Sequence, residues 1–157
     1  MEKIDIGIPD THRESVAFAL NQLLADEHVL YVKTRNYHWN VTGQHFQSLH
    51  SFFEEQYEAL SDIIDELAER IRAIGHYAVA ALKDYVQLAR LLETGHEDGT
   101  AEKMLQNLLN DHETIIRILR QDLENAERHH DLGTAGFLAR LLEKHEKMAW
   151  MLRAYLS

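Results

Sequence analysis

The chain has a single proline, Pro9, and this restricts its fold more than any other feature. Proline is the strongest helix breaker, so nothing after Pro9 stops a helix in that way. Apolar residues then recur three and four positions apart through most of the chain, which is the spacing of one helix face. The glycines gather at a few points, where they mark turns. The sequence therefore predicts an all-α protein.

Two long helices are predicted in the first half of the chain. The residues Thr11 to Glu14 have the form of a capping box, which predicts a first helix from about Thr11 to His38. An apolar face continues from Phe46 to Ile74 and predicts a second long helix. Because only a short turn at 40–43 separates them, the two helices should be antiparallel.

The second half predicts another helical hairpin. The segment between Gly75 and Gly99 is too long for a tight turn, and its apolar middle, 78–92, predicts a short extra helix. Apolar stripes over 104–123 and 138–156 predict the third and fourth long helices, with a turn at 129–136. Two hairpins joined by one long crossover give the ferritin-like four-helix bundle, as opposed to an up-down-up-down bundle.

Length, charge and the lack of cysteine limit the class of protein. A chain of 157 residues that is 45% hydrophobic can bury one core, so residues 11–157 should form one domain after a short N-terminal extension, residues 1–10. There is no cysteine, signal peptide or apolar run of about 20 residues, which predicts a cytoplasmic protein without a membrane span. A net charge of -10 disfavours nucleic acid and anionic lipid and favours cations.

Four residues of the types that bind transition metals stand out. His38 and His50 flank a turn that contains glycine, and Asp65 and Glu69 follow at a spacing of one helical turn. Imidazole suits iron, zinc or copper, and paired carboxylates are hard oxygen ligands. Since the commonest structural zinc sites use thiolates, a mixed set without cysteine points to iron before structural zinc.

The spacing of these residues predicts a centre shared between two chains. Fifteen residues of helix separate His50 from Asp65 by ~22 Å, so one metal cannot reach both within one chain. At 100° per residue the two directions still differ by only about 60°, so both pairs share a broad helix face. Two such helices packed antiparallel across a two-fold axis would bring His50 of one chain beside Asp65 and Glu69 of the other. A solvated acidic face is the alternative interpretation.

These residues occur in the ordered motif H-W-N-x-x-G-x-x-F-x-x-x-H, followed by D-x-x-x-E. In this the chain resembles the Dps family, the miniferritins or DNA-binding proteins from starved cells, over nearly its whole length after residue 10. The resemblance implies a ferroxidase centre between two-fold-related subunits, with His38, His50, Asp65 and Glu69 as catalytic metal ligands. It also implies a homo-oligomeric hollow shell, a dodecamer, that stores iron. The resemblance implies that Glu54 is a further ligand, in a position where the family usually has Asp.

The resemblance further implies what the protein does. Fe(II) would enter through acidic pores, be oxidised at a di-iron-type centre, preferably by hydrogen peroxide, and be stored as a ferric mineral, which protects the cell from oxidative damage. Zinc could occupy the centre as a competitor. DNA binding in the family commonly uses a terminal tail rich in Lys and Arg. Here the N-terminal segment before Thr11 contains one Lys and three acidic residues, Glu2, Asp5 and Asp10, and the chain ends at Ser157. We therefore expect weak or absent DNA binding.

Two other functions stay open at the level of the sequence: a DNA-compacting stress protein, and a helical scaffold with a structural interface metal. Trp39 could donate an electron near the iron or simply fill the interface. Pore residues could include Asp111, Asp122 and Asp131. Several histidines are expected to lie outside the centre. His112 and His145 should be buried or interface histidines with a hydrogen-bond partner. The histidines that end two E-x-x-H patterns, His96 and His130, should be solvated, although His76, His96, His129 and His130 could bind metal adventitiously.

Overall fold

A computed structural model describes residues 4–93 and 99–157, and every regular element in them is a helix. The chain forms α1 (Asp10–Asn40), α2 (Phe46–Ala73), α3 (Leu82–Leu88), α4 (Ala101–Arg128) and α5 (Leu132–Leu156). The all-α prediction is therefore confirmed. No helix within the described residues is both long and apolar enough to cross a membrane.

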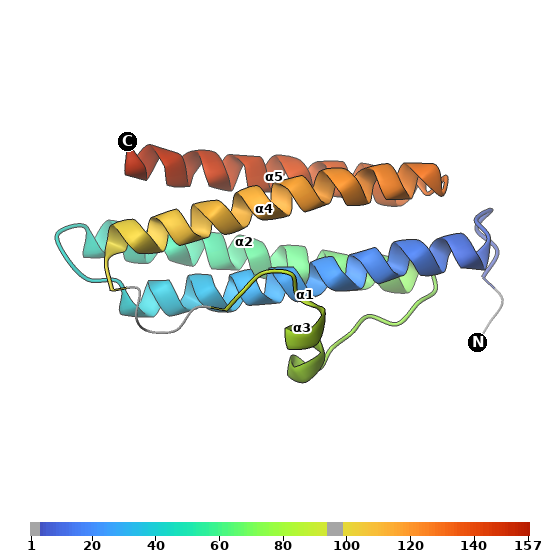
Figure 1. The fold of residues 1–157 in the computed structure, drawn as a ribbon, viewed down its shortest axis with the longest axis horizontal. Coiled ribbons are helices and arrows are strands. Elements are labelled where there is room, and N and C mark those ends of the chain that lie inside the picture. Colours follow the sequence, from blue (N-terminus) through green and yellow to red (C-terminus); the bar gives the residue numbers. More distant parts are fainter. Residues whose placement is uncertain (1–3, 94–98) are drawn as a thin grey trace.

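The four long helices form two antiparallel hairpins (Figure 1). The first hairpin is α1 with α2, and the second is α4 with α5, which packs on the first mainly through α1 and α4. A long crossover carries the chain back along α1, so that α2 and α4 run in the same direction, and α3 lies on the outer side of α1 (Figure 1). This parallel pair confirms the ferritin-like topology.

The core follows the predicted apolar stripes. Each long helix contributes leucine or isoleucine side chains that solvent does not reach, and burial of one such side chain stabilises a fold by roughly 1.5–3 kcal/mol. The largest of these buried side chains are Tyr37, Phe53, Leu20, Leu23, Leu24, Leu30, Leu60, Ile63, Leu67, Ile71, Ile74 and Leu108.

The capping box predicted at Thr11 to Glu14 is wrong. The first helix begins one residue earlier, at Asp10, and no side chain caps it. The carbonyl oxygen of Pro9 instead accepts the N–H groups of His12 and Arg13, both at 3.1 Å. Pro9 is the N-cap residue, with φ of -54° and a non-helical ψ of 146°, and proline has no side-chain acceptor to offer.

The crossover is less helical than predicted, because α1 binds it in an extended form. Only 82–88 of the predicted 78–92 form a helix. On one side, the Asn21 side chain accepts the N–H of Val79 at 2.9 Å and donates to the carbonyl of Tyr77 at 3.1 Å. On the other side, the buried Asp26 carboxylate accepts the N–H groups of Arg90 and Leu91. These bonds satisfy backbone groups that a longer helix would have satisfied internally.

Candidate metal centre

The turn between α1 and α2 brings two imidazole rings together. His38 lies in the last turn of α1, and His50 lies early in α2. Between them Gly43 has φ of +108°, a conformation that favours glycine. The carbonyl of Gly43 accepts the N–H of Phe46, the first residue of α2, at 3.1 Å. The rings of His38 and His50 are thereby stacked, with their centroids 3.8 Å apart.

Each of these histidines is oriented by the main chain of the other. Nδ1 of His38 donates to the carbonyl oxygen of His50 at 2.7 Å, and Nδ1 of His50 donates to the carbonyl oxygen of His38 at 2.8 Å. Because a carbonyl oxygen can only accept, both Nδ1 atoms carry a hydrogen. In the neutral rings Nε2 then holds a lone pair, which is the form in which imidazole binds a metal.

Aromatic rings surround the two imidazoles. The ring of Phe46 stacks on His50 with centroids 5.2 Å apart, and the ring of Tyr57 meets His38 edge-on, also at 5.2 Å. His38 is buried and His50 is half-buried. Partial removal from water strengthens the attraction between an ion and its ligands.

Glu54 is the carboxylate nearest to these histidines along the chain. It lies one helical turn after His50 on α2 and is half-buried. Its Oε1 atom accepts a hydrogen bond from the Tyr57 hydroxyl at 3.3 Å. Removal from water, and then the charge of Glu54, raise the pKa of Tyr57 above its usual range, so this phenol stays protonated as a donor.

Asp65 and Glu69 lie apart from the histidines within one chain. Both are exposed, and they follow His50 on α2 by four helical turns and more. In the part of the chain that the structure describes, no three His, Asp or Glu side chains are arranged to hold a metal ion. Within one chain, His38 and His50 thus lie side by side, whereas Asp65 and Glu69 lie farther along α2.

The exposed side of α2 is strongly acidic. Besides Asp65 and Glu69, it carries Glu55, Glu58, Asp62 and Glu66, all exposed. Of these, Glu66 is paired with Lys144 at 3.3 Å. A surface with this excess of carboxylates attracts cations toward α2.

Trp39 is exposed beside the centre. Its side chain is 61% accessible, and the guanidinium of Arg35 lies 4.7 Å from the centre of its ring. The same guanidinium lies 5.5 Å from the ring centre of Tyr57. Both interpretations of Trp39, electron donor and interface residue, fit this position.

A second polar cluster is buried inside the bundle. His112 on α4 and His145 on α5 are fully buried, with their Nδ1 atoms 3.0 Å apart. Nε2 of His145 lies 2.8 Å from Oε1 of Glu27, a buried acid on α1, but the two atoms do not have the geometry of a hydrogen bond. The prediction that both histidines are buried with a partner is confirmed.

Of the three candidate pore residues, Asp131 was predicted wrongly. Asp131 is only 1% exposed, because its carboxylate caps α5 and binds Arg70 at 2.8 Å. Asp111 is partly buried and paired with Lys33 at 2.6 Å. Burial raises the pKa of Asp122 to about 6, against the lowering effect of Arg90. Asp111 and Asp122 stay predictions.

Two of the other histidines lie directly after the end of α4. His130 is exposed just after α4, as predicted for a solvated residue, and has φ of 59°. His129 is half-buried against His12, with ring centroids 4.7 Å apart. Nε2 of His76 lies 3.4 Å from Oδ1 of Asp10. His96 is outside the described residues.

Two polar contacts were not predicted from the sequence. In the hydrogen bonds between His38 and His50 the acceptors are main-chain carbonyl oxygens. Every residue has such an oxygen, so a sequence pattern does not reveal these bonds. The buried Glu27 had a visible signal, because it follows Leu23 and Leu24 at the spacing of the apolar stripe. An acid on an apolar stripe indicates a buried partner.

Comparison with known proteins gives the family. A model of the ferritin-like domain matches residues 18–157. A Bacillus anthracis protein named DNA protection during starvation protein 2 is 39% identical over 92% of this chain and 98% of its own length. The chain belongs to the ferritin-like Dps family. A Dps protein from Vibrio cholerae, described as a member of a superfamily of ferritin-like diiron-carboxylate proteins, has 35% identity and a TM-score of 0.94, and the match covers 100% of this chain and 98% of that one.

Another relative of this Dps-family chain is named as a protein induced by low temperature. A low-temperature-induced protein from Nostoc is 45% identical over 100% of this chain and 88% of its own length. The structure of Dps from Thermosynechococcus elongatus has a TM-score of 0.90 at 35% identity, and the match covers 94% of this chain and 93% of that one.

Proposed function

We propose that this protein is a ferroxidase and iron-storage miniferritin whose metal centre is completed by a second copy of the chain. His38, His50 and Glu54 of one subunit and Asp65 and Glu69 of the other would form the centre. The observation that carries this proposal is the orientation of the two histidines, whose Nδ1 atoms are occupied and whose Nε2 atoms are left to bind a metal.

The distribution of ligands along α2 supports sharing between two chains. His50 and Glu54 lie in its first half and Asp65 and Glu69 in its second, with the last two exposed. A two-fold axis perpendicular to α2 would place the two α2 helices antiparallel, so the histidines of each chain would meet the carboxylates of the other in two equivalent centres. We further infer that such dimers assemble into a dodecameric shell, as the resemblance to Dps implies.

The donor set suits the oxidation of iron as a substrate. Neutral imidazoles bind Fe(II), whereas the anionic side chains of Asp65 and Glu69 favour the more highly charged Fe(III) and so lower its reduction potential. Two Fe(II) ions supply the two electrons that convert one hydrogen peroxide and two protons into two water molecules. Because both electrons come from iron at one centre, no hydroxyl radical is released. The ferric product would be stored within the shell.

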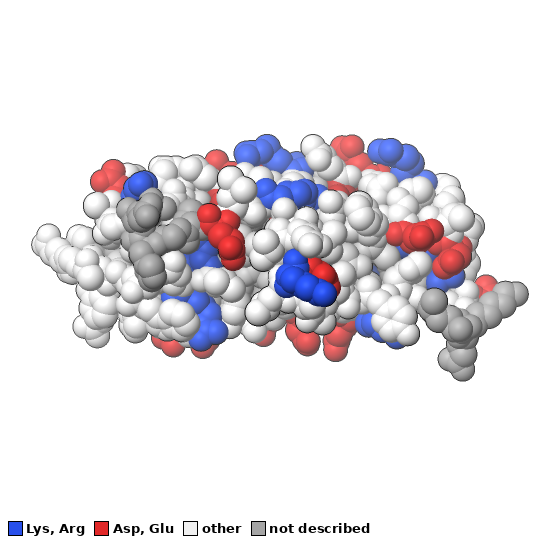
Figure 2. All heavy atoms as spheres, turned by 60° about the horizontal axis from the view of Figure 1, so that its bottom comes forward, with Lys and Arg blue, Asp and Glu red and all other residues white. Residues whose placement is uncertain are grey.

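The charge of the molecule supports cations as ligands over DNA. The net charge is -10. On the face that carries α3, basic and acidic side chains are interspersed and form no continuous basic band (Figure 2). Since DNA affinity grows with the number of phosphates that Lys and Arg neutralise, we propose weak or absent DNA binding, to be measured as a salt-sensitive gel shift.

The proposed function is tested by following iron oxidation. Fe(II) is added to the protein without oxygen, hydrogen peroxide follows, and ferric absorbance is recorded for the wild type and the Asp65→Ala/Glu69→Ala variant. We expect rapid formation of a soluble ferric core in the wild type alone. The matched control is Asp62→Ala/Glu66→Ala, which removes two exposed acids with the same spacing from the same helix and should leave the rate unchanged.

Equal, slow oxidation with precipitation in all three proteins would refute the proposed ferroxidase activity. A helical scaffold with a structural interface metal would then be favoured, and tightly held zinc without turnover would identify it. Peroxide as the preferred oxidant is tested by the same assay with dioxygen in its place, which we expect to be slower.

A further inference from the structure

We propose that Tyr57 is a positioning residue that holds the Glu54 carboxylate for the second metal ion of the centre. This inference rests on the proposed function, because it concerns the same site. It assigns a role to a side chain that belongs to neither the histidine pair nor the carboxylate ligands.

Tyr57 is itself held in place on three sides. Its ring meets His38 edge-on at 5.2 Å and Tyr31 edge-on at 6.0 Å. The guanidinium of Arg35 lies 5.5 Å from its ring centre. A phenol packed in this way offers its hydroxyl in one fixed direction, and that hydroxyl donates to Oε1 of Glu54 at 3.3 Å.

Glu54 needs such a partner because its side chain is long. A glutamate has one more rotatable bond than an aspartate, and ordering it for a metal costs more side-chain entropy. The bond from Tyr57 fixes one carboxylate oxygen of Glu54, and the other oxygen stays available to an ion. Tyr57 follows Glu54 by three residues, so both lie on the same side of α2 as His50, one turn before Glu54.

This arrangement depends on a glutamate at position 54. The resemblance to Dps implies an aspartate there in most members, and an aspartate carboxylate would lie one methylene farther from Tyr57. The tyrosine and the glutamate therefore act as a pair: the longer side chain reaches the hydroxyl, and the hydroxyl compensates for the freedom of the longer side chain.

The test uses Co(II), added without oxygen, because its visible absorption reports the ligands and it does not turn over. The affinities of the first and second ions are measured for the wild type and for Tyr57→Phe, which keeps the ring and removes the hydroxyl. A net hydrogen-bond contribution of ordinary size corresponds to about twofold to tenfold in affinity. We expect a loss of that size for the second ion, a changed absorption of that ion, and an unchanged first ion.

Two comparisons separate positioning from a general structural effect. Tyr31→Phe removes a hydroxyl from the same aromatic group, where it accepts from Arg35 at 3.1 Å, and should leave both cobalt ions unaffected. In a Glu54→Asp background, Tyr57→Phe should have no effect, because the shorter carboxylate does not reach the hydroxyl. A loss of both ions together, or the same loss in the Glu54→Asp background, would overturn the inference.

The same titration distinguishes this inference from the proposed function. If Asp65→Ala/Glu69→Ala abolishes cobalt binding and Tyr57→Phe changes nothing, the shared centre stands and the role of Tyr57 is refuted. If the wild type takes up only one cobalt ion per centre, there is no second position for Glu54 to serve, and the inference fails. If the carboxylate variant binds cobalt like the wild type, both the centre and the inference fail.

Discussion

His112 is a buried histidine whose protonation affects the stability of the fold. It is fully buried between α4 and α5. Burial, and then the neighbouring His145, lower the pKa of His112 well below 6.5. The folded protein therefore keeps this ring neutral at a pH where the unfolded chain would protonate it.

This shift predicts a pH dependence of stability. Because the folded pKa is lowered, the unfolded chain binds more protons below pH 6.5, so the stability due to His112 is complete above pH 6.5 and is lost as pH falls. We expect the Tm to decrease from pH 7 to pH 5, and less so in His112→Asn, which keeps a polar atom near the Nδ1 position. Thermal unfolding over this pH range measures it.

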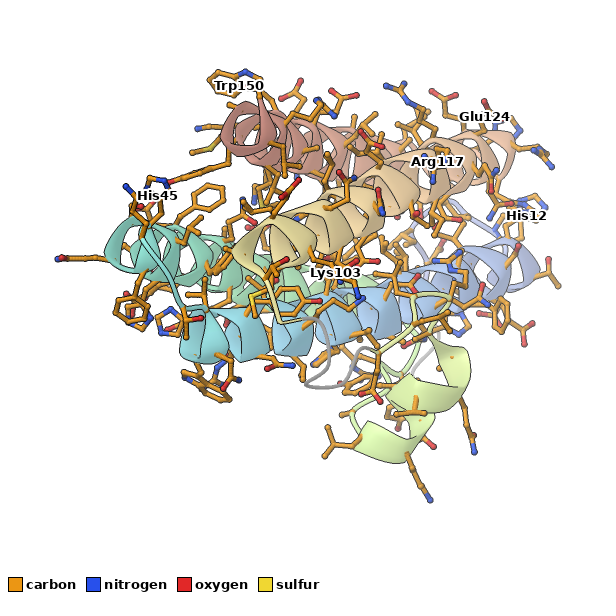
Figure 3. All side chains as sticks on the ribbon, turned by 60° about the vertical axis from the view of Figure 1, so that its left-hand side comes forward. His12, His45, Lys103, Arg117, Glu124 and Trp150 are labelled. Carbon is orange, nitrogen blue, oxygen red and sulfur yellow. The ribbon has the colours of Figure 1, made fainter. Side chains whose placement is uncertain are left out.

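His45 provides the control for that prediction. It is an exposed histidine at the start of α2, at one end of the bundle (Figure 3). His45→Asn should retain the full pH dependence of the wild type. If His112→Asn and His45→Asn lose stability with acid in equal measure, the dependence does not come from His112.

At the scale of single elements, the start of α5 depends on one buried carboxylate. Asp131 accepts the N–H of Thr134 at 2.9 Å and its hydroxyl at 2.6 Å, and it binds Arg70 of α2 at 2.8 Å. It thus caps α5 and joins the two hairpins of the bundle through the same side chain.

Asp131→Ala should be strongly destabilising. The change removes a helix cap and leaves the partly buried Arg70 charge without its partner, which together correspond to a loss of about 3–5 kcal/mol. Thr100→Ala removes only the cap of α4, an exposed 3.2 Å bond from the N–H of Lys103, and should cost about 1 kcal/mol or less. Chemical denaturation measures both changes, and similar losses in the two variants would contradict this account of Asp131.

Helix interiors were easier to predict than helix ends. The apolar spacing that defines an interior repeats over many residues, whereas an end depends on one or two bonds. Thr11 matched a capping pattern, yet Pro9 starts α1 with its carbonyl oxygen. Asp131 read as a turn residue in the segment 129–136, yet it starts α5, because its partner Arg70 lies 61 residues away in the sequence.

At the scale of the whole molecule, a shared centre predicts that two inactive variants restore activity in each other. His38→Ala/His50→Ala lacks one half of every centre, and Asp65→Ala/Glu69→Ala lacks the other half. In a mixed two-fold dimer, one centre combines both defects and the other centre is intact. Co-expression at equal levels should therefore restore about a quarter of wild-type ferroxidase centres, measured as ferric absorbance after addition of peroxide.

A centre formed within one chain gives the opposite result. Each variant would then be defective in all of its own sites, and mixing would restore nothing. Wild-type subunits co-expressed with either variant provide the control for assembly, since they should form mixed oligomers of normal size.

The ligand types proposed for the site come from the sequence, whereas the packing around the two histidines comes from the structure. The spacing of His50 and Asp65 predicts a centre between two chains, and this stays a prediction. In the described part of one chain, no three His, Asp or Glu side chains are arranged to hold a metal ion. The orientation of the imidazoles and the contact of Tyr57 with Glu54 depend on how α1 packs on α2, and a residue pattern carries no information on that packing.

The mutual hydrogen bonds of His38 and His50 also bear on how such a centre can change during evolution. The acceptor of each imidazole is a peptide carbonyl, which every amino acid possesses. Substitution of one histidine therefore removes one proposed ligand without removing the acceptor that orients the other. If the two histidines are metal ligands as proposed, a lineage can lose or exchange one of them and keep the second correctly placed, so metal preference can change here one substitution at a time.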